Sequence, residues 1–217
     1  MLLRFNNYDD PVKFLRHALF ILVFNTTLLA GAETITLTEN QHSVQLHQDL
    51  SYHVDRDRSL NARTVYSIRT RFKPFPYQSI QIPREGILWL TSTVENESGF
   101  DQWVVQNAMN VERMDLFVFD DGKPVGHHVA GNMVPFTQKT VPSRLPAFEV
   151  SIPPGETRTL VFRVFDYQSA SVRLSIENEE RYRTAYNNQS LLLGIVFGFF
   201  LALIVYNAIV FSISRDR

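Results

Sequence analysis

Seven residues in the middle of the chain have side chains suited to binding a small polar organic molecule. An aromatic ring can cover the apolar C–H face of a sugar, while amide, guanidinium and carboxylate groups hold its polar substituents. Trp103 follows the polar loop 97–102, which places it near a loop end. The predicted ligand contacts are Asn96, Trp103, Arg113, Arg144, Arg163, Asp166 and Tyr167.

Two of these residues also have a structural interpretation. Trp103 begins a short apolar stretch, and the sequence favours a place in the core over one in a binding site, as we expect for Trp89 in the middle of its own strand. Arg163 alternates with Val161 and Phe165, so it is either a partly buried structural arginine or a binding residue. The sequence leaves both alternatives open.

Residues for hydrolysis or metal binding are scarce. The chain has no cysteine, which excludes disulfides, thiolate nucleophiles and cysteine-bound zinc. His127 and His128 are adjacent, so in a strand they point to opposite faces and cannot easily share one ion. Asp120 and Asp121 precede a glycine at a turn, where carboxylates usually serve the turn itself. We therefore predict no catalytic residue, no metal site and no cofactor.

The overall charge argues against a nucleic-acid partner. Lysine and arginine total 21 and aspartate and glutamate total 22, so the formal net charge is −1. A protein that binds nucleic acid needs a basic surface to neutralise the phosphates.

Most of the predicted ligand contacts lie in or beside segments with strand periodicity. Leu88, Leu90 and Val94 would share one face of a strand, and apolar alternation recurs at 148–152, 160–164 and 172–176. Turn signals such as Asp120-Asp121-Gly122 and Pro153-Pro154-Gly155 separate these segments. Several short strands with turns between them predict an all-β sandwich or barrel.

One segment has helical spacing instead. Leu60, Thr64, Val65 and Ile68 would lie along one side of a helix over 59–68, with Ser59 as its N-cap. We expect this short helix to pack across one end of the sandwich.

The N-terminus is typical of a secretory signal peptide. A positively charged start precedes a short apolar run, and Ala30 and Ala32 form a small-residue cleavage site. Residues 1–32 are therefore predicted to be the signal peptide, with an uncleaved anchor helix as the alternative.

The C-terminus predicts a membrane span. Leu191–Ile213 contains no charged residue, and at about 1.5 Å per residue it reaches about 34 Å, enough for a hydrocarbon core of about 30 Å. We predict a transmembrane helix over 189–213 and a cytoplasmic stub over 214–217. Small residues on one side of the helix, together with a polar one, predict a face that packs on other helices: Gly194, Gly198, Ala202 and Asn207.

These two apolar segments predict the topology of the chain. Residues 33–188 would be a periplasmic β-sandwich sensor domain, and the chain would cross the bacterial inner membrane once, with Arg217 in the cytoplasm.

The order of motifs resembles a known family. Trp89-Leu90, Trp103-Val104-Val105, Met114-Asp115-Leu116-Phe117-Val118 and Leu160-Val161-Phe162-Arg163-Val164 lead to Gly194-Ile195-Val196-Phe197-Gly198. This order is similar to the type-2 extracellular domain and first membrane helix of bacterial 7TM receptors with diverse intracellular signalling modules. The resemblance implies a jelly-roll-like antiparallel sandwich similar to carbohydrate-binding modules. It also implies further membrane helices and a cytoplasmic output domain, commonly a diguanylate cyclase or a histidine kinase.

The leading hypothesis is a periplasmic ligand-sensing domain of a transmembrane receptor, present here only through its first membrane helix. Its ligand would be a carbohydrate or another small polar organic molecule. The alternative is a self-standing, membrane-anchored protein for glycan binding, adhesion or assembly. A periplasmic enzyme is a more distant third, because it would need a pair of carboxylates facing one cleft.

Overall fold

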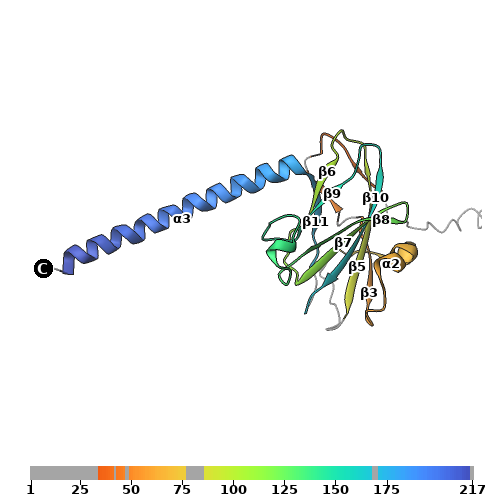
Figure 1. Cartoon of the computed structure of the whole chain (residues 1–217), viewed down its shortest axis with the longest axis horizontal. Helices are drawn as coiled ribbons and strands as arrows, with labels where there is room; N and C mark the ends of the chain where they lie inside the picture. Colours follow the sequence, from red (N-terminus) through yellow and green to blue (C-terminus); the bar gives the residue numbers. More distant parts are fainter. Residues whose placement is uncertain (1–33, 42, 47–48, 77–85, 168–170, 216–217) are drawn as a thin grey trace, which may run out of the picture. The chain divides into compact units, whose positions relative to one another are not determined.

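The computed structural model describes residues 34–215, apart from residues 42, 47–48, 77–85 and 168–170. The predicted signal peptide lies outside the described residues, as do the last two residues of the predicted cytoplasmic stub. The described residues form two β-sheets, a short helix α2 and a long C-terminal helix α3 (Figure 1).

The larger sheet has seven strands. Six of them follow one another across the sheet in the order β4 (Lys73–Pro74), β3 (Ser51–Asp55), β5 (Ile87–Asn96), β10 (Thr157–Phe165), β7 (Arg113–Asp120) and β8 (Lys123–Ala130). The seventh strand, β1 (Thr34–Leu37), runs parallel to the end of β5, whereas the other pairings are antiparallel.

The smaller sheet has four strands and is antiparallel throughout. Their order is β2 (Val44–Gln45), β11 (Leu174–Asn178), β6 (Gln102–Asn107) and β9 (Ala147–Ser151). The loops include the short 3-10 helices η2 (Arg69–Arg71) and η3 (Phe136–Gln138). This architecture confirms the predicted all-β antiparallel sandwich with a short helix.

The main hydrophobic core lies between the sheets. Leu88, Leu90 and Val94 enter it from β5, as their alternation predicts, and meet residues such as Phe148 and Ile176 from the smaller sheet. Fully burying one such large apolar side chain contributes about 1.5–3 kcal/mol relative to leaving it in water. The core therefore holds the two sheets together without any disulfide.

The turn between β7 and β8 follows the predicted signal. Asp121 has φ 39° and Gly122 has φ 82°, and the flanking Asp120 and Lys123 pair across the hairpin. Positive φ at both central residues is the geometry of a type I′ turn, which matches the twist of the strands it joins. The hairpin makes β8 the edge strand of the larger sheet.

Helix α2 (Ala62–Ile68) is shorter than predicted, because it begins later in the chain. The predicted Ser59 N-cap is wrong, because the Asn61 side chain caps the helix by accepting from the Thr64 N–H at 3.0 Å. The Ser59 and Leu60 amides instead donate to the Asp55 carboxylate at 3.2 and 3.0 Å, which holds this segment in a turn.

The second hydrophobic cluster lies on the outer face of the larger sheet, not across its end. Val65 of α2 packs there with Trp89, Phe119 and Val161. Figure 1 shows α2 beside β3 and β5 of the larger sheet. Trp89 is 1% exposed, so it is a core residue as expected, but it belongs to this second cluster. The helix therefore covers part of the outer face of the sheet.

Helix α3 (Glu179–Arg215) begins at the residue after β11. The Asn178 side chain caps it, accepting from the Glu180 N–H at 3.0 Å. Its first turns contact the smaller sheet, where Tyr182 packs with Val104 and Ala147. The helix and the sandwich are therefore joined without a linker.

In the part of the chain that the structure describes, one helix is long and apolar enough to span a membrane. It covers Glu179–Ser214, its most apolar window has mean hydropathy 2.4, and none of that window is buried. A side chain added at Gly194 or Gly198 would meet nothing within 4 Å, and Asn207 bonds only to its own helix, with Nδ2 2.8 Å from the Leu203 oxygen. The predicted packing face is thus open on this helix.

Candidate ligand site

The predicted ligand contacts do not form one site. Asn96 and Trp103 are 0% and 2% exposed, so both side chains lie inside the sandwich and not on its surface. The Asn96 amide donates to the carbonyls of Phe100 and Ile152, both at 2.6 Å, and so fixes the loop before β6. Trp103 alternates inward with Val105 into the main core, because its position in β6, not the preceding loop, sets its direction.

Arg113 and Arg163 meet at a buried carboxylate on the outer face of the larger sheet. Arg113 holds Asp115 by two bonds, Nε to Oδ2 at 3.1 Å and Nη2 to Oδ1 at 2.9 Å. Arg163 Nη1 lies 3.3 Å from Oδ2, and His127 Nε2 lies 3.2 Å from Oδ1. We call these four residues the Asp115 cluster.

The Asp115 cluster is a satisfied ion-pair network. Burial alone would raise the pKa of Asp115, but the hydrogen bonds from Arg113 and His127 and the charge of Arg163 hold it below its usual value. The carboxylate is therefore ionised, and both arginines are engaged with it. This favours the structural interpretation of Arg163 over a binding role.

The remaining predicted residues lie in two places. Tyr167 packs edge-to-face on Phe165 at 5.2 Å, next to the Asp115 cluster, and Asp166 sits between them in the chain. Arg144 is exposed in a loop beside α3, where it borders a separate cavity with Tyr186. The structure thus brings Arg113 and Arg163 together on the larger sheet, places Asp166 and Tyr167 just after the end of β10, and leaves Arg144 apart.

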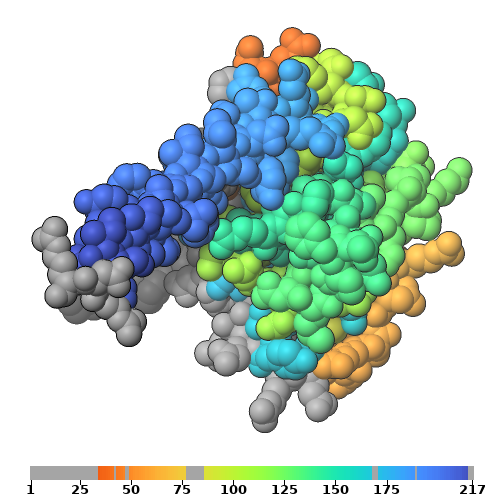
Figure 2. Space-filling view, turned by 60° about the vertical axis from the view of Figure 1, so that its left-hand side comes forward, coloured from red at the N-terminus to blue at the C-terminus, as the bar shows by residue number. Residues whose placement is uncertain are grey.

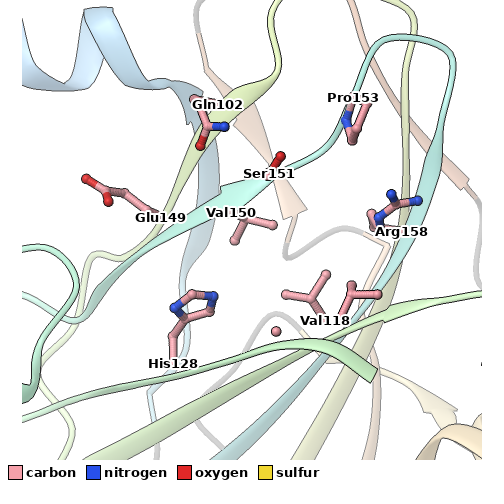
Figure 3. A pocket seen from close by; sticks show the side chains of 10 residues that line it. Gln102, Val118, His128, Glu149, Val150, Ser151, Pro153 and Arg158 are labelled. Atoms are coloured by element: carbon pink, nitrogen blue, oxygen red, sulfur yellow. The ribbon is translucent and has the colours of Figure 1, made fainter. Parts of the chain in front are cut away.

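A cavity of about 440 Å³ lies between the edge strands β8 and β9, where the two sheets part. We call it the edge cavity. Figure 3 shows His128 and Glu149 at one end of it and Arg158 at the other, with Val118 and Val150 between them. Its polar lining is Gln102, His128, Glu149, Ser151 and Arg158, and its apolar lining is Val118, Val125, Val150 and Pro153.

Gly126 keeps the edge cavity open. A side chain added there would lie 3.2 Å from His128 Nε2 and 3.5 Å from Val118 Cβ, both of which line the cavity. Strand glycines often mark a place where another group must approach closely. Nothing in the sequence alone distinguished this glycine from a weak point in the strand.

The side chains that line the edge cavity can form hydrogen bonds, and together they carry little net charge. Burial lowers the pKa of His128, and the neighbouring His127 lowers it further, so its imidazole is neutral at pH 7. The nearly buried Arg158 is already paired with Asp120, at 3.1 Å, and with Glu156. Such a lining suits an uncharged molecule with hydroxyl or amide groups.

The structure confirms that the adjacent residues His127 and His128 point to opposite faces of β8. His127 stacks on Phe117 at 4.3 Å on the outer face, whereas His128 borders the edge cavity. Among the residues that the structure describes, no group of three or more His, Asp or Glu side chains could hold a metal ion.

Glu149 connects the edge cavity with α3. It lines the cavity, and its Oε1 accepts from Arg183 Nη2 of α3 at 3.0 Å. It also borders a second cavity of about 220 Å³ beside Tyr182 and Tyr186. Sequence reasoning missed Glu149, because its alternation with Phe148 and Val150 reveals only that it points away from the core.

Comparison with known proteins adds a family and several distant structural likenesses. A family model described as 7TMR-DISM extracellular 2 matches residues 47–178. No curated protein matches the chain.

Two of the similar solved structures are glycosidases. A β-glucosidase from Paenibacillus barengoltzii is 10% identical with a TM-score of 0.30, over 68% of this chain and 11% of that one. A β-glucuronidase from Ruminococcus gnavus is 9% identical with a TM-score of 0.35, over 66% of this chain and 30% of that one. With these TM-scores the two likenesses carry no argument about this chain. The chain spans less than a third of the length of either enzyme.

Proposed function

The chain belongs to the 7TMR-DISM extracellular 2 family, a sensory domain of transmembrane receptors, and from this premise we propose that its sandwich binds a small polar ligand in the periplasm and reports it through α3. In this proposal residues 33–188 are the sensor domain and α3 crosses the bacterial inner membrane. The face of α3 that carries Gly194, Gly198, Ala202 and Asn207 packs on other receptor helices. These helices lead to an output domain such as a diguanylate cyclase or a histidine kinase.

We place the ligand in the edge cavity. Its volume falls in the range of about 300–1,000 Å³ that is usual for small-molecule sites. Its neutral His128, its amide and hydroxyl groups and its paired ions fit an uncharged polyhydroxyl compound, such as a carbohydrate, better than an anion. A ligand at the Asp115 cluster would instead have to compete with Asp115 for both arginines.

The observation that carries this proposal is the position of Glu149. A ligand can shift a conformational equilibrium only if it interacts differently with the two states. A hydroxyl group bound in the edge cavity would bond to Glu149 and change its pairing with Arg183 on α3. Ligand binding and the position of the first turns of α3 are thereby coupled.

A thermal-shift screen of the full chain in nanodiscs tests the proposal. Neutral sugars and polyols are compared with organic acids and amino acids, and a ligand at 100 times its Kd should add about 2.7 kcal/mol of stability. Gly126→Leu should abolish the shift by filling the cavity, whereas Tyr167→Ala, on the outer face, should keep it. Loss of the shift in Tyr167→Ala alone would move the ligand to the outer face.

A further inference from the structure

A groove of about 320 Å³ lies between the sandwich and the start of the apolar part of α3. We call it the juxtamembrane groove. Arg144 and Asn110 border it from loops of the sandwich, and Tyr186, Ser190 and Leu193 border it from α3. In Figure 2 the first turns of α3, in light blue, lie against the surface of the sandwich.

The groove has a defined position along α3. Tyr186 Oη donates to the Pro142 carbonyl at 3.2 Å, which fixes the helix to the loop that carries Arg144. The uncharged apolar run begins at Leu191, so Ser190 and Leu193 lie where this helix would enter the bilayer. At that level a bilayer presents its phosphate-bearing headgroups.

Arg144 supplies a positive charge that is unpaired among the described residues. Its side chain is exposed, and no described residue forms a hydrogen bond or ion pair with it. The arginines of the edge cavity and of the Asp115 cluster are all paired, so Arg144 differs from them. An unpaired guanidinium beside a membrane entry point suits a phosphate oxygen.

Exposed apolar side chains lie on the adjoining loops. Met109 precedes Asn110 and is 39% exposed, and Phe136 is 59% exposed with Lys139 Nζ 5.3 Å from its ring centre. Two backbone bonds, Asn132 N to Val111 O and Met133 N to Glu112 O, join the two loops that carry them. Apolar and basic side chains together are typical of surfaces that lie on a membrane.

We propose that the juxtamembrane groove binds the headgroup of an anionic phospholipid, with Arg144 on its phosphate and Leu193 beside its first acyl carbons. This site goes beyond the proposed sensory function. It requires α3 in a membrane, but it does not require a ligand in the edge cavity.

Native mass spectrometry of the full chain, released from mixed phosphatidylcholine and phosphatidylglycerol micelles, tests the site. Wild-type protein should retain phosphatidylglycerol in preference to phosphatidylcholine. Arg144→Gln should lower this retention about fivefold, because one arginine at a membrane surface contributes that factor, and Arg144→Lys should keep most of it. Arg63→Gln removes an equally exposed arginine from α2 and should change nothing.

Three results would overturn the proposal. They are equal retention by wild type and Arg144→Gln, equal retention of the two lipids, or a thermal shift with soluble glycerol phosphate as large as with phosphatidylglycerol. The last result would assign the groove to a free phosphate ester. A photoreactive phosphatidylglycerol should cross-link to residues 143–145 and 190–193, and labelling elsewhere would also contradict the site.

Discussion

Glu149 of β9 and Arg183 of α3 form an ion pair with 3.0 Å between Oε1 and Nη2, although 34 residues separate them in the chain. Their side chains are 36% and 62% exposed, so water screens the pair and it adds little to stability. A contact that is weak yet joins the sensor to its helix is easily shifted by a ligand. Arg183 also bonds Glu179 one helical turn earlier, through Nε at 2.6 Å.

Removing the charge of Glu149 should loosen α3 without unfolding the sandwich. We expect Glu149→Gln to raise amide hydrogen exchange over residues 183–190 while the unfolding midpoint hardly changes. Glu179→Gln removes the other partner of Arg183 but leaves the sandwich contact, so it serves as the control. Equal exchange in both variants would show that Glu149 does not hold the helix.

Breaking the Asp115 cluster should lower the free energy of unfolding much more than Glu149→Gln does. Asp115→Asn leaves two arginines and a histidine without their shared carboxylate, and we expect a loss of about 2–4 kcal/mol in the free energy of unfolding. Asp121→Asn lies at the hairpin turn, where asparagine tolerates positive φ, and should change stability by less than about 0.5 kcal/mol. Urea titrations of both variants give the comparison.

The half-buried His128 should make stability fall in mild acid. Its folded pKa lies below the usual 6.5, so below pH 6.5 the unfolded chain takes up a proton that the folded one refuses. Above pH 6.5 His128 does not lower the free energy of unfolding. As the pH falls from 6.5 towards the folded pKa, the free energy of unfolding decreases by up to about 1.4 kcal/mol per pH unit. His128→Gln should reduce the slope of unfolding free energy between pH 6.5 and 5, and an unchanged slope would refute the assignment.

Two glycines with positive φ should differ in their tolerance of alanine. Gly131 has φ 123°, and a Cβ there would lie 2.6 Å from the Glu112 carbonyl oxygen, whereas Gly155 has φ 76° and open space around it. Gly155→Ala should cost about 1 kcal/mol for backbone strain alone. Gly131→Ala adds a clash with backbone and should cost about 3 kcal/mol or more, as chemical unfolding would show.

The strands were predictable wherever alternation was strong. Leu88 and Leu90, or Leu160 and Phe162, mark their strands by apolar spacing, and the structure places each pair in the main core. β8 shows no apolar alternation, because Gly126 and two histidines interrupt its pattern and because an edge strand is paired on one side only. Its position is decided by the turn at Gly122 and by pairing with β7.

The candidate site was less predictable because it depends on contacts between distant segments. Asp115 and Arg163 are 48 residues apart, and only the register of β7 with β10 places them opposite each other. The edge cavity likewise exists because β8 and β9 are neighbouring edges of different sheets. Local spacing contains no information on either arrangement.

Asn178 ends β11 and caps α3, so the rotational phase of α3 is set directly by the smaller sheet. Each residue of an α-helix turns the chain by about 100°. One residue inserted between Asn178 and Leu191 would therefore aim Gly194 and Gly198 into a different sector of the bilayer, while a seven-residue insertion would nearly restore their bearing. The length of this junction is thus as much a part of the receptor's geometry as any side chain on it.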